Sequence, residues 1–104
     1  MFYYRPITYR CARKNDVLTF NSLQDLKEHV AEVYKDLDVD LDDIVLEDSV
    51  YKGRNLNSGL NGEKMVKLKP NDVNIAKFSK WCGTSAVTSS TKILVGFYSV
   101  EKVG

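Results

Sequence analysis

The sequence predicts a single α+β domain, 1–104, in which a mainly antiparallel sheet of four or five strands packs against one long and one short helix. The chain has 104 residues, 43% of them hydrophobic, which suits one domain with a real core. A segment at about 22–36 has the apolar periodicity of an amphipathic helix. Several short segments rich in β-branched and aromatic residues are typical of strands. No repeat or linker divides the chain.

The N-terminal segment predicts a β-hairpin. Residues 2–12 have the composition of a strand, and Pro6 indicates an edge strand or the start of one, because proline cannot donate a backbone hydrogen bond. Residues 14–16 predict a tight turn into a second strand at 17–20.

The long helix is expected at about 22–36, capped by Asn21 or Ser22, with Asp25 as a weak capping-box partner. Its apolar positions form one stripe that we expect to lie on the sheet. They are Leu23, Leu26, Val30, Val33, Tyr34 and Leu37.

The second half predicts two more strands, a short helix and a final central strand. Residues 44–51 favour a strand, 53–62 form a glycine-rich loop, and 65–68 form a short strand with its lysines projecting outward. A helix at about 71–82 starts after Pro70 and ends at Gly83. Residues 92–100 are the most hydrophobic and predict an internal strand, giving the order β-β-α-β-β-α-β. The expected core comprises Leu26, Val30, Val33, Ile93, Val95 and Phe97, the last three sharing a face only if the strand is regular.

The charges are sorted into blocks, although the formal net charge is only +1. Between Asp36 and Asp48, seven of thirteen residues are acidic and none is basic, while 1–14 and 52–80 are basic. Such patterning favours a binding function over catalysis. The acidic binding candidates are Asp36, Asp38, Asp40, Asp42, Asp43 and Glu47.

Three interpretations of segment 36–48 compete. It is a solvated connection whose Leu37, Val39 and Leu41 face the core, or its alternating acids imitate spaced phosphates before a basic groove. A calcium loop is the third, but Leu41 stands where glycine is needed and Asp43 where an apolar residue is usual. We therefore expect no metal and no cofactor.

Aromatic and basic residues at the N-terminus offer a second kind of surface. Tyr3 and Tyr4 are candidate binding aromatics, and tyrosines mixed with cations suit single-stranded nucleic acid. The basic candidates are Arg5, Arg10, Arg13, Lys14, Lys64, Lys67 and Lys69. No nucleic-acid-binding signature accompanies them, and half of the tyrosines must face the core if the segment is a strand.

Catalytic patterns are weak, so we expect no enzyme. His29, the single histidine, falls on the polar or boundary side of the long helix. Ser85, Ser89 and Ser90 lack a nucleophile motif, and Cys82 is at a helix end, where the dipole disfavours a thiolate.

The main hypothesis is a non-catalytic module that binds a protein of unknown identity and basic character. Six tyrosines, four phenylalanines and one tryptophan exceed what one small core needs, and tyrosine and tryptophan dominate interfaces. The composition is similar to that of small proteins encoded by phages and mobile elements, which suggests an inhibitor or regulator of a host protein. Because Arg5, Pro6, Arg10 and Arg13 rule out a signal peptide, we expect a cytoplasmic protein without membrane contact.

Overall fold

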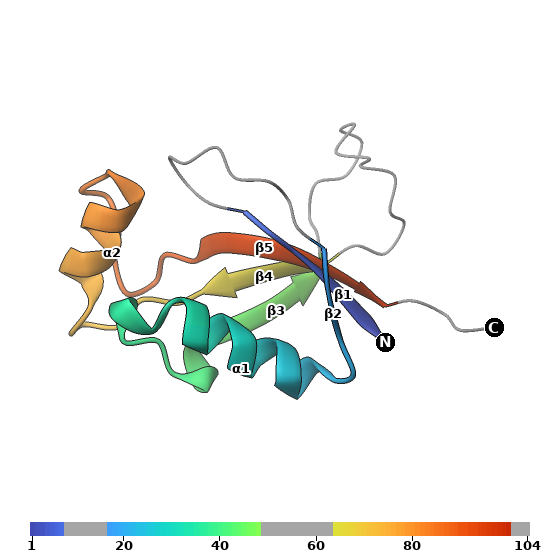
Figure 1. Cartoon of the computed structure of the whole chain (residues 1–104). Helices are drawn as coiled ribbons and strands as arrows, with labels where there is room; N and C mark the ends of the chain where they lie inside the picture. The colour runs from blue at the N-terminus through green and yellow to red at the C-terminus, as the bar shows by residue number, and fades with distance from the viewer. Residues whose placement is uncertain (8–16, 49–63, 101–104) are drawn as a thin grey trace, which may run out of the picture.

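The computed structural model describes residues 1–7, 17–48 and 64–100, and the expectations for 8–16, 49–63 and 101–104 lie outside that part. The fold is the predicted α+β domain, with a five-stranded antiparallel sheet and two helices (Figure 1). In chain order the elements are β1 (Phe2–Pro6), β2 (Leu18–Phe20), α1 (Leu23–Val33), η1 (Lys35–Leu37), η2 (Leu41–Asp43), β3 (Ile44–Asp48), β4 (Lys64–Leu68), α2 (Ile75–Cys82) and β5 (Ile93–Val100), where η marks a single 3-10 turn.

The sheet has the strand order β2-β1-β5-β4-β3, so β5 lies at its centre, as its hydrophobic sequence predicted. β1 pairs with β2, which confirms the strand pairing of the expected hairpin, although the turn at 14–16 is not described. The prediction that Pro6 marks an edge strand or the start of one is wrong, because β1 lies between β2 and β5 and Pro6 is its last residue. Pro6 is tolerated there because β2 pairs only with residues 2–4, so the missing N–H interrupts no described ladder.

α1 covers one face of the sheet, and α2 lies beyond one end of it (Figure 1). Ser22 is the N-cap, since its Oγ accepts a hydrogen bond from the Asp25 backbone N–H at 3.1 Å. The helix is shorter than predicted, because it ends at Val33 and the chain tightens into η1. Val33 is 54% exposed at the margin of the apolar stripe, so its assignment to the core is wrong. Leu26 and Val30 are fully buried, as predicted.

A bulge in β5 changes which of its side chains face α1. The register passes from Val66 opposite Gly96 to Lys67 opposite Leu94, so Val95 is an extra residue. Ile93 and Val95 are buried as predicted, but Phe97 faces the opposite side of the sheet and is only half-buried. Its prediction as a core residue fails because the bulge breaks the two-residue alternation.

The bulge accompanies a close approach of Tyr4 to the backbone of β5. The Tyr4 hydroxyl donates a hydrogen bond to the Val95 carbonyl at 3.0 Å. A Cβ on Gly96 would lie 2.3 Å from Tyr4 Cε1, so only glycine leaves room for the ring.

Within the described ranges, neither helix has the length and apolar character needed to cross a membrane.

Candidate interaction surface

The acidic segment 36–48 alternates buried apolar residues with exposed acids. Leu37, Val39 and Ile44 are buried, whereas the acids between them face solvent. The exposed acids of this stretch are Asp36, Asp38, Asp40, Asp42 and Asp48. The apolar side chains fix the segment to the core and so determine where the carboxylates project.

Local hydrogen bonds give the segment a defined backbone. Asp38 adopts the left-handed conformation, with φ 54°, and so ends η1. Asp40 and Asp43 form a reciprocal capping box around η2, each side chain accepting the backbone N–H of the other. The acids at 38, 40 and 43 therefore shape the segment as well as charging it.

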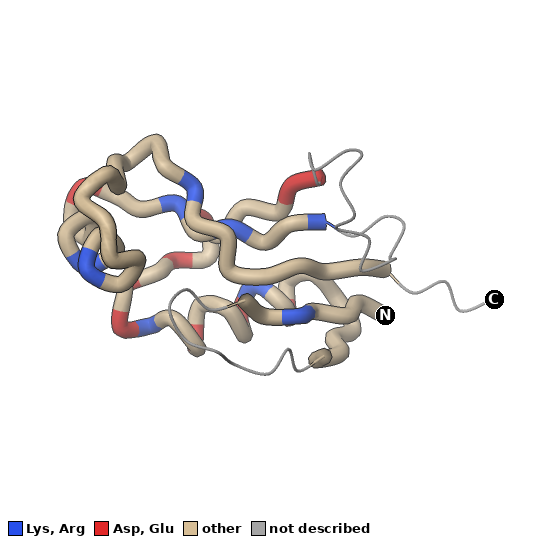
Figure 2. Tube along the Cα trace, turned by 90° about the horizontal axis from the view of Figure 1, so that it is seen from above, with Lys and Arg blue, Asp and Glu red and all other residues tan. Residues whose placement is uncertain are grey.

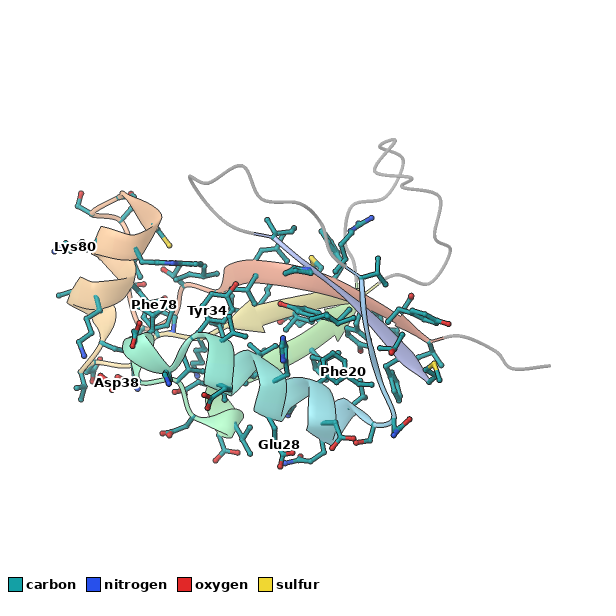
Figure 3. The ribbon with its side chains drawn as sticks, in the orientation of Figure 1. Phe20, Glu28, Tyr34, Asp38, Phe78 and Lys80 are labelled. Atoms are coloured by element: carbon teal, nitrogen blue, oxygen red, sulfur yellow. The ribbon has the colours of Figure 1, made fainter. Side chains whose placement is uncertain are left out.

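α2 holds the start of the segment in place. Asn74 is fully buried, and its Nδ2 donates to the Leu37 carbonyl at 2.9 Å. Lys77 Nζ lies 2.6 Å from Asp38 Oδ2, and the Trp81 ring meets the Tyr34 ring edge-on with centroids 5.6 Å apart. Figure 3 shows Tyr34, Asp38 and Phe78 gathered at this junction, with Lys80 pointing away from it.

Ion pairs neutralise the C-terminal part of the segment. Glu47 binds Lys92 and lies 3.3 Å from Lys67, and the hydrogen bond from Lys92 is the main reason that the pKa of Glu47 is lowered. Asp48 lies 2.9 Å from Lys64, and this hydrogen bond raises the pKa of Lys64. In the folded molecule, acidic and basic residues from different parts of the chain lie among one another, although they form separate blocks in the sequence (Figure 2).

Three exposed acids of segment 36–48 have no ion pair to another described residue. They are Asp36, Asp40 and Asp42, at and between the two 3-10 turns. The Asp40 side chain accepts the backbone N–H of Asp43. Within segment 36–48, these three carboxylates are the ones available to a basic partner.

The basic candidates do not form one surface. The strand register places Arg5 and Lys67 on the sheet face away from α1 but Lys64 on the face toward it, so the lysines expected to project outward from this strand do not share one face. Neighbouring positions on a strand alternate between faces, so an odd spacing separates 64 from 67. Lys69 is exposed just after β4. Arg10, Arg13 and Lys14 lie outside the described residues.

Tyr4 is not a surface aromatic. It is 2% exposed, and burial raises the pKa of its hydroxyl far above the ordinary value. Its proposed binding role is therefore wrong, because the pleat of β1 turns Tyr4 toward α1. Tyr3 is half-buried on the opposite face, where the Arg5 guanidinium lies 5.4 Å from the centroid of the Phe97 ring.

His29 and Cys82, the residues considered for a catalytic role, are both partly buried. His29 is half-buried, with its ring centroid 5.2 Å from that of Phe20 and 6.2 Å from that of Tyr4. Burial raises the pKa of the half-buried Cys82 thiol, which disfavours the nucleophilic thiolate. Over residues 1–7, 17–48 and 64–100, no three His, Cys, Asp or Glu side chains are grouped to hold a metal ion.

Sequence reasoning missed the contribution of α2 to this surface. The available signal was the spacing of Asn74, Lys77 and Trp81, which places them on one side of a helix. Their partners, Leu37, Asp38 and Tyr34, are too distant in the chain to be found by periodicity.

Comparison of the chain with protein-family models, curated proteins and solved structures gave no match. The fold and the chemistry of the surface are therefore the basis for a function.

Proposed function

We propose that this protein is a non-catalytic protein-binding module whose acidic segment meets a basic surface on its partner. The supporting observation is that Asp36, Asp40 and Asp42 are exposed and not ion-paired within the described residues, on a backbone fixed by buried neighbours. Carboxylates held in place favour electrostatic steering, because complementary charge accelerates encounter. The narrower form of the proposal is an inhibitor or regulator of a host protein in the cytoplasm.

The test neutralises the three available acids. In the variant Asp36→Asn, Asp40→Asn and Asp42→Asn, the backbone hydrogen bonds can persist because asparagine also accepts them. We expect association with the captured partner to slow by about tenfold at low salt and to lose most of its salt dependence, with little change in dissociation. Affinity capture identifies the partner, and surface plasmon resonance across a salt series measures both rates.

A control with the same change of charge isolates the position of the acids. Glu28, Glu32 and Asp72 are exposed acids outside the segment, and their replacement by Gln, Gln and Asn changes the net charge equally. Glu28 lies on the outer side of α1 (Figure 3). Equal slowing in both variants would reduce the effect to net charge and remove the acidic segment from the proposal.

Single-stranded nucleic-acid binding is a second candidate, because Tyr3, Arg5 and Phe97 share the sheet face away from α1. Stacking aromatics beside a cation suit such a ligand. The pairing of Lys64 and Lys67 with acids weakens this candidate. It requires affinity for a labelled oligonucleotide that falls steeply as salt rises, and an absence of binding at low salt would eliminate it.

A further inference from the structure

The outer edge of β3 carries backbone groups that have no partner in the described chain. β3 is the last strand of the sheet and pairs only with β4. The Lys69 N–H donates to the Asp43 carbonyl at 2.8 Å, and the β3–β4 register places these two residues opposite each other. They therefore form a hydrogen-bonded pair of the antiparallel ladder.

Alternation along the ladder then assigns the direction of every β3 backbone group. Val45 and Glu47 bond to β4, whereas the N–H and C=O groups of Ile44, Leu46 and Asp48 point away from it. The Ile44 N–H donates a hydrogen bond to the Leu41 carbonyl. Within the described residues, the Leu46 N–H and C=O, the Ile44 C=O and the Asp48 N–H have no backbone partner and so remain for a further strand.

The two edges of the sheet differ in their protection. β2 has three residues and is followed closely by α1, whereas β3 has five residues and carries neither lysine nor proline, the residues that usually block an edge. Its exposed surroundings are acidic, with Asp40 and Asp42 before the strand and Asp48 at its end. Pairing with a second copy would bring these acids together in either strand direction, which is unfavourable.

We propose that β3 accepts an extended, lysine- or arginine-bearing peptide segment of a partner protein as a sixth strand. This inference rests on the proposed function and specifies the partner's conformation. Backbone hydrogen bonds supply the pairing, and the unpaired acids Asp40 and Asp42 before the strand select a basic segment over an acidic one.

The first test uses a capped peptide that alternates lysine and valine, titrated into the ¹⁵N-labelled full chain. We expect hydrogen exchange of the Leu46 amide to slow by about tenfold or more at saturation, because that N–H becomes bonded. The same peptide N-methylated at every residue keeps its charge but has no backbone N–H to donate from either edge. Equal binding of the two peptides would overturn the proposal.

The second test changes the edge of the protein itself. Leu46→Pro removes an outward N–H, whereas Leu46→Ala also shortens the side chain but keeps that N–H. We expect the lysine–valine peptide to bind the proline variant about tenfold more weakly than the alanine variant. If Leu46→Pro does not fold, Asp48→Pro and Asp48→Ala provide the same comparison at the exposed end of the strand. Equal affinities within the folded pair would contradict strand pairing.

Two outcomes separate this proposal from the wider one. In the first, neutralising Asp36, Asp40 and Asp42 abolishes peptide binding, but the proline and alanine variants bind equally. This result would support the acidic contact and contradict pairing of the peptide as a sixth strand. A wild-type dimer in sedimentation that dissociates in Leu46→Pro would instead assign the edge to a second copy and overturn the basic peptide as its occupant.

Discussion

Gly96 makes space for the buried ring of Tyr4 in the middle of the sheet. We expect Gly96→Ala to destabilise the protein by about 1–3 kcal/mol, because its Cβ would overlap a ring that cannot move aside. Urea denaturation measures this, with Ser99→Ala on the same strand as a control of less than about 0.5 kcal/mol. In a Tyr4→Leu background the penalty should shrink, and an undiminished penalty would show that Tyr4 is not its cause.

Glu47 links stability to pH. Its folded pKa lies below the ordinary value of 4.5, so its contribution is present above 4.5 and is lost as the pH falls through the folded value. We expect the melting temperature of Glu47→Gln to depend less on pH across this acidic range than that of the parent. Glu28→Gln, which alters an exposed helix residue, should keep the parental dependence. Parallel curves for the parent and Glu47→Gln would contradict a role of the Lys67 and Lys92 pairs.

At the scale of elements, the cost of a substitution in α1 depends on whether the residue lies within the apolar stripe or at its margin. Val30 is fully buried, and Val33, three residues later, is 54% exposed. We expect Val30→Asp to cost several kcal/mol, about 3 or more, since it buries a charge. Val33→Asp introduces the same side chain at a cost of at most about 1 kcal/mol. Similar melting temperatures for the two variants would contradict this difference in packing between Val30 and Val33.

α2 depends on Asn74 for its attachment to the acidic segment. Asn74→Ala leaves the Leu37 carbonyl without its donor and should destabilise the protein by about 1–3 kcal/mol. We also expect Asn74→Ala to accelerate amide hydrogen exchange more in η1 and α2 than in the central strands. Asp72→Ala changes an exposed neighbour and should affect neither. Uniform acceleration across the whole sheet would instead indicate global destabilisation alone.

Local patterns predicted the elements better than the contacts between them. The apolar spacing of Leu26 and Val30 identified α1, and the hydrophobic run at 92–100 identified the central strand. The sequence could not distinguish Tyr3 from Tyr4, because both faces of β1 carry tyrosine and only the register determines which is buried. The bulge at Val95, the early end of α1 and the Lys67–Glu47 pair likewise depend on residues distant in the chain.

For the whole molecule, the acidic segment predicts little response to calcium. Lys77 binds Asp38, and Lys67 and Lys92 bind Glu47, so these carboxylates have cationic partners already. We expect millimolar calcium to leave the melting temperature unchanged, since only binding to the native state stabilises it. A calcium-dependent increase that Glu47→Gln abolishes would establish a metal site.

The central place of β5 also determines the order in which the sheet can form. β5 is the last described strand, yet it pairs with β1 and β4, and Val100 lies opposite Phe2. Contacts between residues so distant in sequence close slowly, because the entropy of a long loop is lost before the contacts form. During synthesis, β1 and β4 therefore lack their shared neighbour until β5 emerges. The edges of β1 and β4 that later pair with β5 are exposed until then.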